Sequence, residues 1–389
     1  MLALLHGTVA ALKEALLTTS VYTALYYAAV TTGVLAASTY FCSACLFAPV
    51  IRFKGAHVVV TGGSAGIGLS VAKEYVVLGA DVTIVARNPK VLADAAEELA
   101  YLAKNVGSKS TIRTVSVDVG SSENFVRMAF VNQLIPDCDI LVNCAGTSIA
   151  APFEELGSDD FERMLRVNVL GSIYPTRVLL PGMKRRGGGR IVFVSSQVAQ
   201  CALHGYTAYA ASKWAVRGLA EALSMEVRPF GIYVSVAYPP DTDTPGYKNE
   251  MLTKPSLTAT LSSAGTVFKP ALVARDIANY SSLGYFGITT GFDGWLLKQL
   301  HPGMTPVHNA WEVLCQVLFC PIARIISVFY VAWFYHVVAA DKNREENDPG
   351  PWRDSAPSVV SPSSNSEGVQ EPVTPHAALS KRAPISKDR

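Results

Sequence analysis

Thr61-Gly62-Gly63-Ser64-Ala65-Gly66-Ile67-Gly68 is the stretch that decides the fold. It follows a β-branched apolar run at residues 57–61 and opens a helix-like stretch. Glycines let the backbone turn tightly and approach a pyrophosphate, while a helix N-terminus supplies free N–H groups and partial positive charge. A purely structural glycine turn is the alternative. A strand before and a helix after the loop are the context of a phosphate site, so the sequence predicts one here.

Strand-like and helix-like runs alternate along the chain after this loop. The strand-like runs are residues 57–61, 82–86, 114–117, 140–143, 191–195 and 233–237. Helix-like stretches between them include residues 66–78 and 89–104, the second opened by Asn88 and a proline. Repeated alternation predicts an α/β domain of the Rossmann type, with a doubly wound parallel sheet, over residues 55–305.

The N-terminal region predicts a membrane anchor over residues 1–54. Half of the 389 residues are hydrophobic, and residues 15–51 contain no charged side chain. The apolar run at residues 21–51 is longer than the roughly 20 residues that span a bilayer, which predicts a transmembrane helix. A cleaved signal peptide is the alternative, but its apolar region is usually about 7–15 residues after a basic start. Arg52 and Lys54 follow and favour a cytosolic position for the next domain.

Residues 306–340 form a second hydrophobic segment, which predicts membrane association. Glu312, Pro321, Arg324 and His336 interrupt it, so one simple span is not favoured. The segment is expected to enter the bilayer near its end, to lie along the membrane, or to form a re-entrant hairpin. A buried helical pair that closes the enzyme core is the alternative. Residues 341–389 are rich in proline, serine and charge and are predicted to be disordered.

The composition indicates the redox compartment of the protein and limits the kinds of partner that it binds. Seven cysteines lie without paired spacing, which favours a reducing compartment over a disulfide framework. Cys42 and Cys45 form a C-x-x-C in an uncharged apolar run, and without a second pair or a histidine cluster no metal site is expected. A net charge of +2 without a dense basic and aromatic run gives no sign of nucleic-acid binding. The oligomeric state, including a homo-oligomer, stays open.

The end of the second predicted strand indicates which dinucleotide binds. An acidic residue there would bind the free ribose hydroxyls of NAD, whereas a cation suits the 2′-phosphate of NADP. This chain has Arg87 at that place. NADPH is therefore the favoured cofactor, with Ser64 and Arg87 as expected phosphate contacts. An ordinary solvated arginine is the alternative reading.

Tyr209 and Lys213 are spaced by four residues, which places both side chains on one face of a helix. Such a pair arises by chance, so its context decides. Ser196 ends a predicted strand before it, Asn143-Cys144-Ala145-Gly146 ends another, and Asn168 lies in a helical stretch between them. A tyrosine beside a cation can exchange protons with a ketone that accepts a hydride.

These motifs resemble those of the short-chain dehydrogenase/reductase family, in the same order and over about residues 55–245. The resemblance implies that Tyr209 is the general acid, that Lys213 lowers the pKa of Tyr209, and that both hold the nicotinamide ribose. It also implies that Ser196, rather than its neighbour Ser195, binds the substrate carbonyl, and that Asn168 holds a water in a proton relay. The implied cofactor contacts are Gly62, Ser64, Ala65, Gly66, Gly68, Arg87, Asp118, Asn143, Tyr209 and Lys213.

The loop Tyr238-Pro239-Pro240-Asp241-Thr242-Asp243-Thr244-Pro245-Gly246 departs from the usual Pro-Gly of the family. With the hydrophobic C-terminal segment, it resembles the branch that reduces 3-ketosphinganine to sphinganine with NADPH at the cytosolic face of the endoplasmic reticulum. The resemblance extends to about residue 340 and implies a long-chain sphingoid ketone as substrate and the lipid bilayer as a partner. A long-chain ketone partitions into bilayers and must be met at their surface.

Other functions stay open at this point. A membrane-anchored reductase of the same fold that acts on a retinoid, a steroid or a 3-ketoacyl thioester is one alternative. A non-catalytic membrane scaffold is another, although an intact Tyr, Lys, Ser and Asn set disfavours it. Asp241 or Asp243 is a hypothetical partner of the substrate ammonium group; the alternative is that these short side chains hydrogen-bond their own turn.

Overall fold

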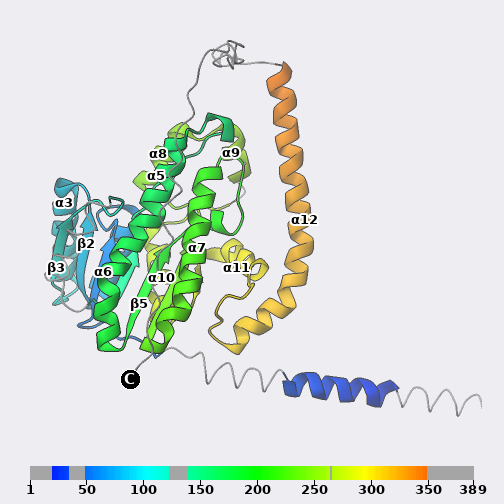
Figure 1. Ribbon diagram of the computed structural model, residues 1–389, viewed down its shortest axis with the longest axis horizontal. Helices are drawn as coiled ribbons and strands as arrows, with labels where there is room; N and C mark the ends of the chain where they lie inside the picture. Colours follow the sequence, from blue (N-terminus) through cyan, green and yellow to red (C-terminus); the bar gives the residue numbers. More distant parts are fainter. Residues whose placement is uncertain (1–19, 35–48, 122–137, 263–264, 348–389) are drawn as a thin grey trace, which may run out of the picture. The chain divides into compact units, whose positions relative to one another are not determined.

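A parallel sheet of seven strands forms the centre of the protein, in the order β3-β2-β1-β4-β5-β6-β7 (Figure 1). The computed structural model describes residues 20–34, 49–121, 138–262 and 265–347. Its strands are β1 (His57–Thr61), β2 (Asp81–Ala86), β3 (Ile112–Ser116), β4 (Ile140–Asn143), β5 (Gly189–Val194), β6 (Ile232–Tyr238) and β7 (Gly287–Thr289). The strand order reverses between β1 and β4, where ligands bind in such sheets. The predicted doubly wound Rossmann sheet is confirmed.

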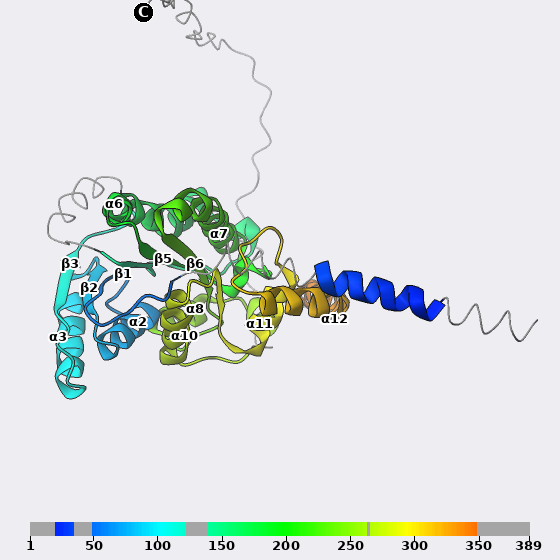
Figure 2. The same ribbon diagram turned by 90° about the horizontal axis from the view of Figure 1, so that it is seen from below.

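Helices cover both faces of this sheet (Figure 2). One face packs against α2 (Gly66–Val77), α3 (Pro89–Asn105) and α10 (Pro270–Ser282), and the other against α6 (Gly171–Arg186) and α7 (Thr207–Val227). Alternate side chains of one strand therefore enter different cores: Val58 and Val60 pack with the α2 side, and Val59 packs with the α6 side. Both faces are buried, which explains why the strands read as continuous apolar runs.

Shorter helices lie in the loops that follow the strands. They are α5 (Ser158–Met164), α8 (Pro245–Thr253), α9 (Ser256–Ser262) and α11 (Gly291–Leu300). Asn88 caps α3, because its side chain accepts hydrogen bonds from the N–H groups of Lys90 and Val91. β7 was not predicted, because three residues are too few to show a periodicity. β3 begins two residues and ends one residue before the predicted run at residues 114–117.

The C-terminal hydrophobic segment is one helix, α12 (Ala310–Asn347). Neither a hairpin nor a buried helical pair forms, so those two expectations are wrong. The polar residues that interrupt the sequence are accommodated: Glu312 pairs with Lys298 of α11, and Arg324 donates to the Ser327 hydroxyl. Among the described residues, Trp311–Asp341 is the one helix long and apolar enough to cross a membrane, and 6% of its most apolar window is buried.

The N-terminal region is described in part. Residues 20–34 form a helix with exposed side chains. Residues 35–48, with Cys42 and Cys45, and the tail from residue 348 lie outside the described residues, so the N-terminal span and the disordered tail stay predictions. The segment that leads into β1 is fixed to the domain, because Ile51 N donates to Ser282 O at 3.2 Å and the buried Arg190 guanidinium donates to Pro49 O.

Candidate active site

The glycine loop between β1 and α2 leaves the first turn of α2 open to an anion. Gly62 and Gly66 have φ angles of 67° and 56°, a conformation that other residues rarely adopt. A Cβ atom on Gly68 would lie 2.3 Å from the carbonyl oxygen of Gly62, so the loop packs on the helix only without a side chain. α2 begins after Ala65 with no side-chain cap, which leaves its first N–H groups available to a phosphate. The loop therefore fits a dinucleotide.

The other residues predicted to bind the cofactor divide into two groups. Arg87 and Asp118 line the same cavity as the loop, and Asp118 also accepts a hydrogen bond from Gly120 N at 2.9 Å. Asn143 lies beneath the cavity instead: it is 2% exposed and donates to Thr176 Oγ1 at 3.0 Å. Its implied direct contact with the cofactor is not supported by this position; the residues after it line the cavity.

Thr61 is a residue that the sequence analysis quoted without giving it a role. Its hydroxyl oxygen accepts hydrogen bonds from the N–H groups of Cys144 and Ala145, each at 3.1 Å. These bonds join the carboxyl ends of β1 and β4, which form the point where the strand order reverses. Thr61 thereby fixes the two loops that line the cofactor side of the cavity.

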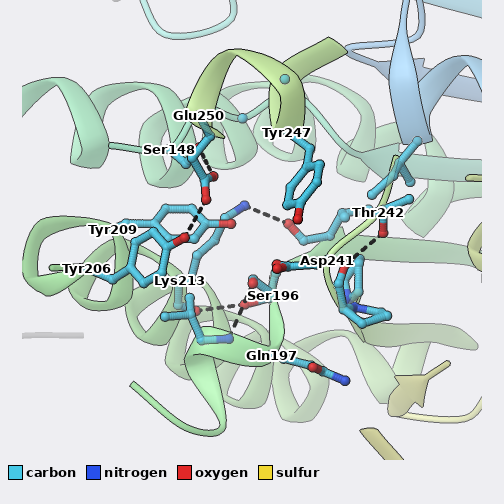
Figure 3. Close-up of a pocket in the computed structure, with 18 of the residues that line it drawn as sticks. Ser148, Ser196, Gln197, Tyr206, Tyr209, Lys213, Asp241, Thr242, Tyr247 and Glu250 are labelled. Carbon is cyan, nitrogen blue, oxygen red and sulfur yellow. Dashed lines mark hydrogen bonds between the residues drawn. The ribbon is translucent and has the colours of Figure 1, made fainter. Parts of the chain in front are cut away.

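Tyr209, Lys213 and Ser196 gather at the carboxyl ends of the central strands (Figure 3). Tyr209 and Lys213 lie one turn apart on α7, and Lys213 Nζ is 5.8 Å from the Tyr209 ring centroid. Lys213 Nζ also donates to Val194 O at 3.0 Å. Ser196, the second residue after β5, hydrogen-bonds Tyr209. Ser195 instead donates to Lys213 O at 3.0 Å, so Ser196 is the serine that the geometry brings to the tyrosine.

Burial is the largest influence on the pKa values of Tyr209 and Lys213. It raises the pKa of Tyr209 above its ordinary value, and the hydrogen bond from Ser196 only partly opposes that shift. Burial lowers the pKa of Lys213 to about 8. The expected lowering of the Tyr209 pKa by Lys213 does not appear in the chain by itself, because removal from water disfavours the charged form of both groups. Tyr209 is held as a neutral phenol, which is a proton donor.

Asn168 supports this pair from a π-helical turn, Leu165–Leu170, between α5 and α6. Its Oδ1 accepts from Thr147 N at 2.9 Å, and its Nδ2 donates to Thr147 O at 3.0 Å and to Ser212 Oγ at 2.8 Å. Ser212 precedes Lys213 on α7 and donates to Tyr209 O. Both ends of the amide are thus engaged within the protein. Asn168 holds the backbone of Thr147 directly and the Tyr209 turn of α7 through the Ser212 hydroxyl.

The structure adds polar residues that the sequence analysis missed. Glu250 on α8 accepts hydrogen bonds from Ser148 Oγ at 2.6 Å and from the Tyr206 hydroxyl. Tyr206 lies three residues before Tyr209, and the two ring centroids are 5.7 Å apart. Tyr206 is the residue before α7, and its place three residues before Tyr209 was the signal for it in the sequence. No pattern in the sequence points to Glu250, which the fold brings in from a distant helix.

A single cavity of about 1500 Å³ connects these groups. It begins at the glycine loop and passes Ser196 and Tyr209. It then reaches a wall contributed by α11 and α12, whose apolar lining residues are Leu296, Leu297, Leu300, Ala323, Ile326, Tyr330, Val331 and Phe334. The polar residues Asp293, Arg324 and Ser327 also line this part. The loop Pro239–Thr242 forms another part of the wall. Asp241 therefore faces the cavity, whereas Asp243 lies outside it and pairs with Lys248 at 3.2 Å.

The parallel sheet, the glycine loop at its switch point and the buried tyrosine, lysine and serine define a class: α/β enzymes that bind a dinucleotide beside a proton donor. A family model described as short chain dehydrogenase matches residues 56–254. The chain belongs to the short-chain dehydrogenase/reductase family, as its motifs predicted.

Curated relatives and solved structures agree with this assignment. The chain is 45% identical over 292 residues to the 3-ketodihydrosphingosine reductase of Bos taurus, covering 74% of this chain and 87% of the relative. It is 36% identical over 291 residues to the enzyme of that name from Dictyostelium discoideum, covering 71% and 86%. The crystal structure of L-sorbose reductase from Gluconobacter frateurii, complexed with NADPH and L-sorbose, matches with 26% identity and a TM-score of 0.55, covering 62% and 97%.

Proposed function

We propose that this chain is an NADPH-dependent reductase that converts 3-ketosphinganine to sphinganine. The observation that carries the proposal is the cavity that joins the glycine loop, Tyr209 and the apolar wall of α11 and α12. A dinucleotide, a ketone and a long alkyl chain need these three surfaces in this order. The 45% identity to the curated 3-ketodihydrosphingosine reductases of Bos taurus and Mus musculus supports the same substrate.

NADPH fits the cofactor side of the cavity, and it supplies the hydride that is transferred to the carbonyl carbon. The open first turn of α2 would hold the pyrophosphate. Ser64 and Arg87 would bind the 2′-phosphate, since both line the cavity and an arginine guanidinium suits a phosphate dianion. Asp118 would contact the adenine end, and Tyr209 and Lys213 would hold the nicotinamide ribose.

Tyr209 supplies the proton. Hydride transfer leaves negative charge on the ketone oxygen, which requires a donor within hydrogen-bond reach. In the chain by itself Ser196 hydrogen-bonds Tyr209, which leaves the Tyr209 O–H to point at that oxygen. The Ser196 hydroxyl would turn to the ketone oxygen when the substrate binds. Because Lys213 has a pKa of about 8, most of it is protonated at neutral pH, and its charge stabilises the phenolate that Tyr209 becomes. Because the side-chain amide of Asn168 is engaged with Thr147 and Ser212, Asn168 is proposed to support the relay that returns a proton to this tyrosine by holding these residues in place.

A substitution at Arg87 tests whether the enzyme prefers NADPH to NADH. Arg87→Ala is expected to raise KM for NADPH by about 10- to 100-fold, because a charged hydrogen bond is worth about 1.5–3 kcal/mol. KM for NADH, which has no 2′-phosphate, should change little. The measurement is the initial rate of cofactor oxidation against the concentration of each cofactor. Lys90→Ala is the matched control, since Lys90 is an exposed cation near Arg87 that does not line the cavity. An unchanged KM for NADPH would show that Arg87 is a solvated arginine that does not bind the 2′-phosphate.

The alkyl chain of the substrate is proposed to lie between α11 and α12. Leu297 and Leu300 line this part of the cavity from α11, and Ile326 and Phe334 line it from α12. Each buried methylene group contributes about 0.8 kcal/mol, so a long chain gains much of its affinity here. The same wall explains why a hydrophobic helix follows the catalytic domain directly in the sequence.

α12 is proposed to lie in the membrane interface rather than across the bilayer. Its 31-residue apolar stretch is about 46 Å long at 1.5 Å per residue, longer than the roughly 30 Å hydrocarbon core. Ala323 to Phe334 contributes residues to the cavity wall, so lipid cannot surround the helix on all sides. The apolar residues on its outward side, such as Ile325 and Phe329, are more than 60% exposed and suit an interface. The location proposed for the chain is the cytosolic face of the endoplasmic reticulum: Arg52 and Lys54 favour the cytosolic side, and the endoplasmic reticulum is what the resemblance implies.

The proposal is tested by incubating the purified chain with NADPH and 3-ketosphinganine in detergent. Oxidation of NADPH, with sphinganine identified as the product by mass spectrometry, is the expected result. Steroid, retinoid and 3-ketoacyl thioester substrates serve as the comparison panel. If one of these ketones is reduced and 3-ketosphinganine is not, the substrate assignment is wrong while the reductase assignment stands.

A further inference from the structure

A buried ammonium group lies beside two carboxylates at the wall of the cavity. The Lys254 side chain is 1% exposed, and its Nζ is 3.5 Å from Glu250 Oε1 and 3.9 Å from Asp241 Oδ2. Nζ makes no hydrogen bond to any described residue. Burying a charge without hydrogen bonds is costly, so the surroundings must strongly favour a cation at this place.

Two tyrosine rings complete those surroundings. Lys254 Nζ lies 5.4 Å from the ring centroid of Tyr206 and 5.8 Å from that of Tyr247. Aromatic ring faces attract cations at such distances. We call Asp241, Glu250, Tyr206 and Tyr247 the cation cage; all four line the cavity, and Figure 3 shows them around the reacting groups.

The two carboxylates of the cage are not equivalent. Glu250 accepts hydrogen bonds from Ser148 and Tyr206 and is the nearer partner of Lys254. The Asp241 carboxylate accepts no hydrogen bond from a described residue, and its ion pair with Lys254 is the longer one. Its side chain is 36% exposed toward the cavity. Two carboxylates and one ammonium leave the cage with a negative charge, and Asp241 is the group that lacks a donor.

The cage lies next to the place where the carbonyl must bind. The Tyr206 and Tyr209 ring centroids are 5.7 Å apart, and the charges of Asp241 and Glu250 both raise the pKa of Tyr209. In 3-ketosphinganine the ammonium group is on the carbon next to the carbonyl. A carbonyl oxygen held by Tyr209 and Ser196 therefore brings the ammonium group to the same wall.

We propose that Asp241 binds the ammonium group of the substrate inside the cation cage, while Lys254 stays paired with Glu250. This inference rests on the proposed function and names the contact that recognises the amino group. The incoming cation balances the remaining negative charge and gives Asp241 the donors that it lacks. The cage thereby selects an amino ketone over a ketone of equal length without the amine.

Asp241→Asn tests this assignment with two substrates. One is 3-ketosphinganine, and the other is the matching 1-hydroxy-3-ketone that lacks the amino group. The variant is expected to raise KM for 3-ketosphinganine by about 10- to 100-fold, as for the loss of a charged hydrogen bond. KM for the ketone without the amine, and KM for NADPH, should stay within about twofold. Asp243→Asn is the matched control, because Asp243 lies two residues away, outside the cavity.

The outcomes separate the two proposals. A wild-type chain that reduces the ketone without the amine but not 3-ketosphinganine contradicts the proposed function, and the inference is overturned with it. A wild-type chain that reduces 3-ketosphinganine upholds the function. In that case, equal losses for both ketones in Asp241→Asn, or no loss for either, overturn the ammonium site. Turnover of the ketone without the amine also reports that the variant is folded.

Discussion

Replacing Tyr209 with phenylalanine is expected to lower kcat for ketone reduction by about 10²- to 10⁴-fold, the usual contribution of a positioned general acid. The substitution removes one oxygen and leaves the ring on α7 in place. Ser196 keeps its hydroxyl, but an aliphatic hydroxyl is a much weaker acid than a phenol, so it does not replace Tyr209 as the proton donor. The rate of NADPH oxidation with 3-ketosphinganine in detergent measures the effect.

The control for Tyr209→Phe is Tyr101→Phe, since the Tyr101 ring is 69% exposed on α3, far along the chain from the site. Its kcat should equal that of the wild type. NADPH binding, followed by the change in protein fluorescence, should survive within about tenfold in both variants, because one lost hydrogen bond costs about 1 kcal/mol. A Tyr209→Phe enzyme that keeps more than a tenth of the wild-type kcat would exclude Tyr209 as the proton donor.

Gly68→Ala is expected to abolish NADPH binding and to lower the free energy of unfolding by about 2–3 kcal/mol, as overpacking does. The new Cβ atom would lie 2.3 Å from the carbonyl oxygen of Gly62, which is backbone and cannot rotate away. The whole loop must therefore shift from α2, and the open helix end no longer faces the pyrophosphate. NADPH titration and urea unfolding measure the two effects.

Gly218→Ala provides the matched control. Gly218 lies inside α7 with nothing within 4 Å of an added Cβ, so the same substitution should raise the free energy of unfolding by about 0.5–1 kcal/mol through helix propensity. NADPH binding should not change. Both glycines lie in helices, so the free energy of unfolding should change in opposite directions only because there is room for a Cβ atom at Gly218 and none at Gly68. Destabilisation by both variants to the same extent would show that the contact at Gly68 is not the cause.

Much of the site could be predicted because it lies where strands end. The carboxyl ends of parallel strands meet at one edge of a sheet. Ser196 after β5 and the glycine loop after β1 therefore had to lie together once the strand order was known. Tyr209 and Lys213 followed from helical spacing. The periodicity of short apolar runs was sufficient for the sheet, apart from β7, whose three residues carry no pattern.

The cation cage could not be predicted in the same way. Glu250 and Tyr247 lie on α8, whose position over the cavity depends on how the loop after β6 folds back. The pKa shift of Tyr209 could not be predicted from the sequence either, because burial, rather than the nearby lysine, decides whether the pKa rises or falls. Asn143 shows the same limit: the motif was found, but the side chain points to Thr176 beneath the cavity.

The C-terminal segment is more continuous than its composition suggested. Glu312 and Arg324 argued against one simple span, yet both lie in one helix: Glu312 pairs with Lys298 of α11, and Arg324 donates to Ser327 within α12. Pro321 lies inside α12 without ending it. The pairing of Glu312 depends on how α11 and α12 pack, which the sequence does not show.

The shared wall between α12 and the cavity has a consequence for enzyme kinetics. If α12 lies in the interface, as proposed, a substrate that reaches Tyr209 along this helix is drawn from a two-dimensional phase and not from bulk water. The quantity that saturates the enzyme is then the mole fraction of ketone in the micelle or bilayer. Adding inert detergent at constant total ketone dilutes that surface and slows the reaction, although no inhibitor is present.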